Sequence, residues 1–255
     1  EATLTVLGDA VFVPGSLMEE RFNNANRDAV NIGNVGAPDQ VNYWTSFDGP
    51  VDVANNFSRS VSGFFIPAAT GDYVFWTCSD DDSDFFISTN DQPDTKRLCA
   101  QEQNYSGALQ WLAGSTTMKR SDTWSPDGGT TMPYSGGIHL EAGVRCWIQG
   151  VMHEGGGGDN HSATFKLLAA ADPANGDATA FVSGVIGHME APAVEPIKVS
   201  IAKNADGSIT VSWTGGGALE AATSVLGPWQ EVSSTSPYTF TPQAGVSAMF
   251  GRVKK

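Results

Sequence analysis

Short runs of β-branched and aromatic residues, each closed by a turn rich in Gly, Pro, Asp or Asn, dominate the chain. The clearest runs cover residues 61–66, 73–78, 85–88, 144–152 and 162–167, and helical periodicity is sparse. Runs of this length between turn residues are typical of antiparallel strands. The pattern predicts an all-β protein, with a large antiparallel domain followed by a smaller β domain.

The domain organisation is predicted from shifts in composition. Residues 1–171 are expected to form the large domain, and residues 197–255 a small β domain with a hairpin at Asp206–Gly207. Between them, the Ala-, Pro- and Gly-rich stretch 172–196 reads as a linker with one possible strand at 181–186. One short helix is expected over residues 17–26, because Ser16 is followed three positions later by Glu19.

The charge balance excludes several classes of partner. The 255 residues hold 14 Lys and Arg against 28 Asp and Glu, a net charge of −14. Nucleic-acid binding requires a basic surface, and attraction to anionic membranes does too, so neither is expected. No apolar run approaches the roughly 20 residues of a membrane-spanning helix, so no membrane insertion is expected.

Three cysteines, Cys78, Cys99 and Cys146, leave at least one thiol unpaired within a single chain. The absence of a C-x-x-C motif argues against a zinc or thioredoxin-like site. Cys78 and Cys99 flank an acidic loop on neighbouring predicted strands, and a disulfide between them is a hypothesis that geometry has to decide.

Two loops carry the most specific chemistry. The first holds four carboxylates within five positions, at Asp80, Asp81, Asp82 and Asp84. Carboxylates this close repel one another, and a hard cation such as Ca²⁺ relieves that repulsion. The second is the glycine-rich stretch 154–160, whose backbone freedom allows a close approach to a ligand or another loop. The alternative for both is a solvated turn.

Taken in order, these segments resemble the protective-antigen fourteen-kilodalton (PA-fourteen) family. The resemblance covers roughly residues 10–170 and rests on residues 63–76 followed by Ser79-Asp80-Asp81, then 85–90, 138–143, 147–148 and 153–160. It implies an antiparallel β-sandwich or barrel from a secreted, extracellular or cell-surface protein, with bacterial members among its relatives. The tail more loosely resembles immunoglobulin-like or fibronectin type III-like modules of secreted bacterial proteins, with Trp213, Trp229 and Tyr238 as core aromatics.

The resemblance also implies a ligand set. In yeast adhesin members a cis-linked Asp-Asp pair holds a Ca²⁺ that contacts sugar hydroxyls, and Asp80 and Asp81 match that pair. A later Asn ligand would correspond to Asn160 or Asp159. Predicted metal ligands are therefore Asp80, Asp81 and Asn160. The ligand-binding set adds Asp84, Asp159 and Trp124, a loop residue suited to stacking on sugar, although a packed core position is the alternative for Trp124.

The resulting prediction is a non-catalytic, lectin-like carbohydrate-binding module assisted by Ca²⁺. One alternative is a structural or adhesive subunit of a surface fibre, whose partners are copies of itself or other surface proteins. Another is the accessory region of a larger glycoside hydrolase. No pair of carboxylates stands out for hydrolysis. A zinc site is disfavoured because the cluster His153, Glu154, Asp159 and His161 has no His-Glu-x-x-His helix.

Overall fold

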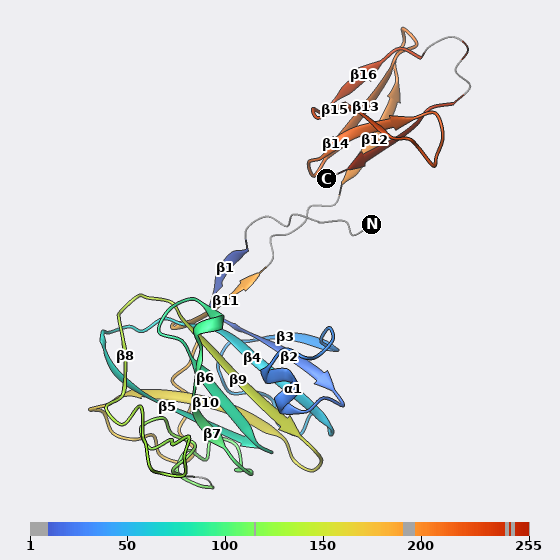
Figure 1. The fold of residues 1–255 in the computed structure, drawn as a ribbon. Helices are drawn as coiled ribbons and strands as arrows, with labels where there is room; N and C mark the ends of the chain where they lie inside the picture. The colour runs from blue at the N-terminus through green and yellow to red at the C-terminus, as the bar shows by residue number, and fades with distance from the viewer. Residues whose placement is uncertain (1–9, 115, 191–196, 243–244, 246–247, 255) are drawn as a thin grey trace. The chain divides into compact units, whose positions relative to one another are not determined.

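The chain folds into two compact units whose regular secondary structure is almost entirely β (Figure 1). The computed structural model describes residues 10–114, 116–190, 197–242, 245 and 248–254. One unit comprises Phe12–Glu190, and the other comprises Ala191–Lys255 with Glu1–Val11. Residues 191–196 of the expected linker lie outside the described residues. The predicted all-β, antiparallel fold class is confirmed. Within the described part of the chain, no helix has the length and apolar character needed to cross a bilayer.

Two antiparallel sheets build the unit Phe12–Glu190, here called the first unit. The larger has the order β1 (Val11–Pro14), β11 (Ile186–Glu190), β4 (Phe57–Phe65), β9 (Cys146–Glu154), β6 (Ser83–Ile87) and β7 (Arg97–Glu102). Beside β4 it also carries β2 (Leu17–Asn23), which pairs with β3 (Gln40–Trp44). The smaller sheet has the order β10 (Asn160–Leu167), β5 (Gly71–Asp80) and β8 (Ile138–Leu140).

The core of the first unit lies between these sheets. Its centre is a set of aromatic rings in mutual contact, Phe65, Phe75, Phe85, Phe165 and Phe181. All nine residues of β4 are buried, because side chains cover both faces of this central strand. Burial of large aromatic side chains is the main stabilising contribution in such a core.

A second apolar cluster lies on the opposite face of β5. There Val74, Trp76 and Cys78 pack against Trp111 from the segment between β7 and β8, which contains no described strand. The expected Cys78–Cys99 disulfide is wrong: the cysteines are free thiols. Successive strand residues point to opposite faces. Cys78 therefore faces this second cluster, whereas Cys99 faces the core between the sheets.

The predicted helix over residues 17–26 is also wrong, because most of it forms β2. Leu17 and Glu19 are buried, whereas Met18 and Glu20 are partly exposed, which is the alternation of a strand. Pairing with both β3 and β4 therefore outweighs the local helix signal. The helix α1 covers Arg27–Asn31 instead and is capped by Asn26, whose side chain accepts from the Ala29 amide at 2.8 Å. A short 3₁₀ helix, η1, covers Pro93–Thr95.

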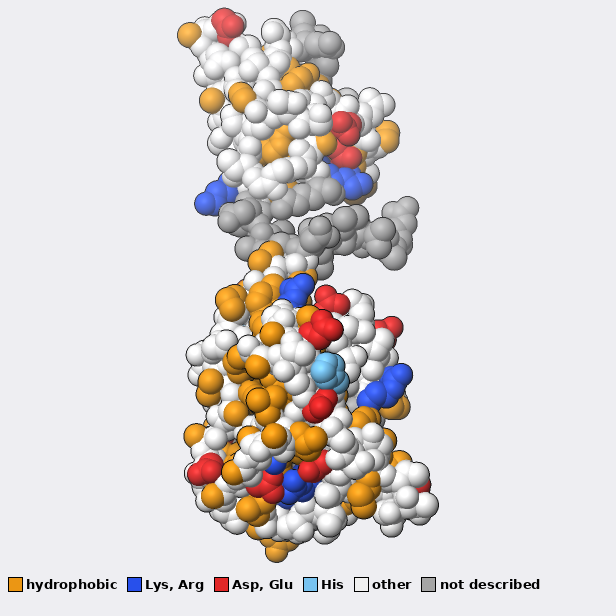
Figure 2. Space-filling view, turned by 90° about the vertical axis from the view of Figure 1, so that its left-hand side faces the viewer, with side chains coloured by type: hydrophobic (Ala, Val, Ile, Leu, Met, Phe, Trp, Pro, Cys, Tyr) orange, Lys and Arg blue, Asp and Glu red, His pale blue; other side chains and the backbone are white. Residues whose placement is uncertain are grey.

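The expected strand at 181–186 begins later, as β11 (Ile186–Glu190). Phe181 precedes it and is fully buried in the core of the first unit. On the face of this unit seen in Figure 2, apolar side chains cover much of the surface, and acidic side chains lie among them at several places, some beside basic ones.

The second unit contains two three-stranded sheets. One has the order β12 (Lys198–Lys203), β13 (Ile209–Thr214) and β16 (Tyr238–Phe240), and the other β15 (Gln230–Ser233), β14 (Ala218–Ala222) and β17 (Phe250–Lys254). The predicted hairpin at Asp206–Gly207 joins β12 to β13. Trp213 is buried in its core and Tyr238 packs against that core. Trp229 lies outside it, under the Arg252 guanidinium, which is 4.4 Å from the ring centre.

Candidate functional site

The acidic loop and the glycine loop meet at one end of the first unit. β5 ends at Asp80, and β10 begins at Asn160, directly opposite Asp80 in the antiparallel register. β9 ends at Glu154, which brings a further carboxylate to the same place. Antiparallel pairing thus joins residues that are about 80 positions apart in the sequence.

Three carboxylates converge there. Oxygen atoms of Asp80, Asp81 and Glu154 all lie within 4.8 Å of one another. Asp81 is held in place by the backbone: its Oδ2 accepts from the Gly155 amide at 2.9 Å, and its own amide donates to the His153 carbonyl at 3.1 Å. The peptide bond between Asp80 and Asp81 is cis. We call Asp80, Asp81 and Glu154 the carboxylate cluster.

Buried oxygen atoms at this site have no donor. Both carboxylate oxygens of Glu154 are buried and have no hydrogen-bond partner among the described residues, and the same holds for Asn160 Oδ1. The Asn160 amide nitrogen donates to the Ser106 carbonyl at 3.0 Å, which turns the carbonyl oxygen of this side chain away from Ser106. A buried polar atom without a partner is costly, so these acceptors fit a cation.

The pKa shifts in the cluster also favour a bound cation. Burial and the neighbouring charges of Asp81 and Asp80 raise the pKa of Glu154 to about 7. Burial, followed by the charge of Asp81, also raises the pKa of Asp80. Burial and the neighbouring negative charges both disfavour the ionised form of these carboxyl groups, and a bound divalent cation would oppose both effects.

Two predicted ligands are engaged elsewhere. Asp159 is buried next to the cluster, but its oxygens accept from the Val53 amide at 2.6 Å and from Arg59 Nη2 at 3.0 Å. Asp84 accepts from the side-chain amides of Asn31 and Gln101. These carboxylates stabilise neighbouring loops, so they do not face the cluster as free ligands.

The prediction that Trp124 stacks on a ligand is not supported by its position. Its side chain is buried, its indole nitrogen donates to Gln101 Oε1 at 3.0 Å, and its ring packs against Tyr134. Neither face of the indole is open. The alternative of a packed position describes this residue.

An open depression borders the carboxylate cluster. Its volume is about 800 Å³, and it is lined by Asp81, the segment 104–107, Ala113 and Gly114. Tyr105 on this segment is 66% exposed, and its backbone pairs with Asp80 in an isolated bridge. An exposed aromatic side chain beside a cation site offers a flat apolar surface to a ligand.

Comparison with known proteins gives only distant structural similarity. No family model matches the chain, and no curated protein matches it. The Epithelial Adhesin 6 A domain from Candida glabrata, solved with Galβ1-3GlcNAc, has a TM-score of 0.45 at 13% identity, covering 72% of this chain and 91% of the adhesin.

Two other solved structures are similar to about the same degree. The PA14 domain of the MpAFP antifreeze protein has a TM-score of 0.43 at 11% identity, covering 73% of this chain and 96% of that domain. An anti-sigma factor domain-containing protein from Clostridium clariflavum has a TM-score of 0.41 at 14% identity, covering 73% of this chain and 52% of its own. The site is therefore interpreted below from its own residues.

Sequence reasoning missed Glu154 and Tyr105 as site residues. Glu154 follows the longest predicted strand, 144–152, and begins the predicted glycine loop, and this position was a usable signal for Glu154. Tyr105 has no such signal, because it lies in a long stretch without strand periodicity. Of the predicted residues, the structure brings together Asp80, Asp81 and Asn160.

Proposed function

We propose that the first unit is a non-catalytic, lectin-like module that binds carbohydrate with the help of a calcium ion. The observation that carries the proposal is the set of buried acceptors without donors, Glu154 and Asn160 Oδ1, beside the carboxylates of Asp80 and Asp81. These four residues offer oxygen ligands only, which is the set Ca²⁺ prefers.

In the proposed role, the chain's own residues hold the ion and shape the depression beside it. A bound calcium ion would offer open coordination positions to vicinal sugar hydroxyls. Tyr105 supplies the exposed aromatic surface on the segment that walls the depression. The proposal includes an extracellular location, where calcium-binding modules have dissociation constants of about 0.1–1 mM.

The test is calorimetric titration of calcium into the wild-type protein, Asp81→Asn and Glu154→Gln, with Glu141→Gln as control. Glu141 lies exposed on a turn away from any described carboxylate group, so its variant should match the wild type. We expect saturable binding in the wild type and at least a tenfold weaker affinity, about 1.4 kcal/mol, in each cluster variant.

Sugar binding is tested separately, with the methyl glycosides of galactose, mannose and glucose in calcium and then in EDTA. Binding that requires calcium supports the whole proposal. Calcium binding without sugar binding would retain the metal site and reject the lectin role. Absence of calcium binding in the wild type would reject both and favour the alternative of an assembly subunit.

A further inference from the structure

A second depression lies over the larger sheet, at Ser60 on β4 and Gln149 on β9, and none of its lining residues belongs to the carboxylate cluster. We call it the sheet groove; its volume is about 560 Å³. Ser60 on β4 forms the floor of the groove. Its side chain is smaller than those of Glu20 on β2 and Gln149 on β9, which lie on either side of it. Apolar side chains of Phe22, Val30 and Val35 border it on one side.

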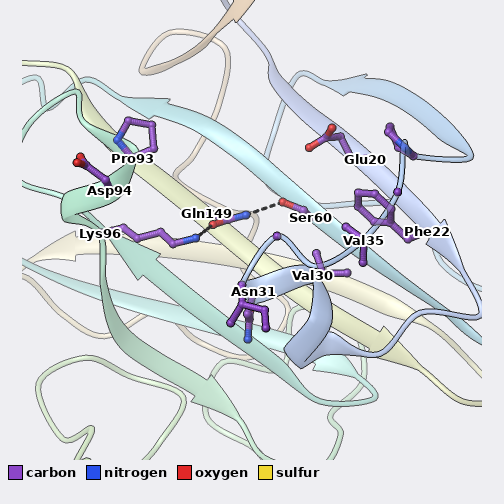
Figure 3. A pocket seen from close by; sticks show the side chains of 14 residues that line it. Glu20, Phe22, Val30, Asn31, Val35, Ser60, Pro93, Asp94, Lys96 and Gln149 are labelled. Carbon is purple, nitrogen blue, oxygen red and sulfur yellow. Dashed lines mark hydrogen bonds between the residues drawn. The ribbon is translucent and has the colours of Figure 1, made fainter.

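A chain of polar groups crosses the floor of the sheet groove (Figure 3). Lys96 Nζ donates to Gln149 Oε1, and Gln149 Nε2 donates to Ser60 Oγ at 2.8 Å. Glu20 lies beyond Ser60, as its direct cross-strand neighbour. The groove thus has Lys96 at one end, Glu20 at the other, and an amide and a hydroxyl between them. The carboxylate of Asp94 also lines the Lys96 end, but it is exposed to solvent and forms no ion pair with Lys96.

Neither charge has a counter-ion. Lys96 is half-buried over the ring of Phe86, 4.9 Å from its centre, and forms no ion pair with a described carboxylate. Glu20 is half-buried and has no hydrogen-bond or ion-pair partner among the described residues. Burial lowers the pKa of Lys96 and raises that of Glu20, with no compensating charge for either group. Partly desolvated charges without partners are costly and favour a ligand of opposite charge.

The spacing of the two charges sets the length of that ligand. Lys96 Nζ lies at the Gln149 side chain on β9, and Glu20 lies on β2, two strands away. Strands in a sheet lie about 4.8 Å apart, and Gln149 lies opposite Ser62, two residues along β4 from the position opposite Glu20, so the two ends of the groove are separated by roughly 10–12 Å. An extended peptide rises about 3.3–3.6 Å per residue, so three residues span this distance, whereas a single amino acid does not.

The middle of the groove also suits a peptide. An amide group has two hydrogens and a serine hydroxyl has one. The hydrogen bond to Ser60 uses one hydrogen of the Gln149 amide group, which leaves its second hydrogen and that of the Ser60 hydroxyl without an acceptor among the described residues. Peptide carbonyls are acceptors of the right kind. An acidic sugar would satisfy Lys96 but would leave Glu20 without a partner.

We propose that the sheet groove binds a short zwitterionic peptide of about three residues, with its terminal carboxylate at Lys96 and its terminal ammonium at Glu20. The site is separate from the carboxylate cluster, and the proposal does not depend on calcium or carbohydrate. It would give the first unit a second ligand, recognised by the charges at the two ends of the peptide.

The experiment uses the full chain and the peptide trialanine, titrated by calorimetry or followed by NMR, in EDTA. N-acetyl-trialanine lacks the ammonium and trialanine amide lacks the carboxylate. We expect each modification to weaken binding to the wild-type protein about fivefold or more, since charge-assisted hydrogen bonds are lost. This comparison requires no variant.

Variants then assign each end of the peptide. In Glu20→Gln, acetylation should cause no further loss, and in Lys96→Met, amidation should cause none. Glu141→Gln and Lys203→Met, which change exposed charges elsewhere, should bind trialanine like the wild type. The proposal is overturned if trialanine does not bind at roughly 10 mM. It is also overturned if the acetylated or amidated peptide binds as tightly as trialanine, or if both groove variants keep the full end-group selectivity.

Discussion

His161 lies in the core of the first unit among aromatic rings, 5.4 Å from Phe47 and 6.4 Å from Trp44 between ring centres. Both of its ring nitrogens are buried without a hydrogen-bond partner among the described residues. Burial, and then the nearby positive charge of Arg59, hold the pKa of His161 well below its usual value of 6.5. The imidazole is therefore neutral in the folded protein.

This arrangement predicts a loss of stability in mild acid. Below pH 6.5 the unfolded chain binds a proton at His161 that the folded chain does not, so the free energy of unfolding falls as pH falls. The slope is up to about 1.4 kcal/mol per pH unit for one proton. His161→Leu should flatten that slope between pH 6.5 and 5, measured by urea unfolding. His139→Leu, at an exposed position, serves as the control. An unchanged slope in His161→Leu would contradict the prediction.

Some site residues could be predicted from the sequence and others could not, because side-chain contacts decide which carboxylates face the cluster. Asp80, Asp81 and Asn160 follow from the family pattern, which marks both loops. Whether a carboxylate faces the cluster or a neighbouring loop depends on side-chain contacts across the sheet. Asp159 and Glu154 flank the same glycine loop, yet one binds Arg59 and the other has no partner. Only the three-dimensional contacts distinguish them.

At the scale of elements, the segment between β7 and β8 is held by one buried cation. Lys119 Nζ lies 3.0 Å from Glu102 Oε2 and donates to Ser106 Oγ and to the carbonyls of Gln110 and Ala113. Ser106 in turn accepts from Asn160 through its carbonyl. Lys119 thus connects this segment to the carboxylate cluster.

Lys119→Met should lower the free energy of unfolding by about 3–5 kcal/mol, because Glu102 loses a buried ion pair. Calcium affinity should fall as well, since Ser106 no longer fixes Asn160. Lys203→Met, at an exposed strand position, should stay within about 0.5 kcal/mol of the wild type. Chemical denaturation with calcium titration measures both effects. Unaltered calcium binding by a folded Lys119→Met protein would disprove the connection.

Gly63 sets the contact between β4 and β11. Its φ is +156°, and an added Cβ would lie 2.4 Å from the Gly187 carbonyl oxygen. Gly63→Ala should therefore destabilise the first unit by about 2 kcal/mol or more, since two paired strands must separate. Gly36→Ala, where an added Cβ meets open space, is the matched control. Thermal melting of both variants tests this, and equal melting temperatures would contradict it.

The sequence predicted the strands that are densest in aromatic and β-branched residues, but not β2. Residues 73–78 and 144–152 are dense in aromatic and β-branched residues, and they form β5 and β9. β2 was predicted as a helix because Leu17-Met18-Glu19-Glu20-Arg21 has good helix formers and a capping residue. Its strand conformation depends on pairing with β3 and β4, which no local pattern encodes.

At the scale of the whole molecule, the carboxylate cluster and the sheet groove both belong to the first unit. A fragment of residues 10–190 is therefore expected to fold and to bind calcium with an affinity within about twofold of the full chain. Calorimetric melting and calcium titration of the fragment check this. A fragment that does not fold, or that binds calcium much more weakly, would show that the second unit supports the site.

The three free thiols also belong to the first unit, and all of them are buried. Burial raises the pKa of Cys146 to about 11 and that of Cys99 further still, so the reactive thiolate is scarce in the native state. Alkylation by iodoacetamide must then wait for this unit to open, while the cysteine-free second unit contributes no signal. The rate of alkylation therefore reports how often the first unit opens, with no contribution from the second unit.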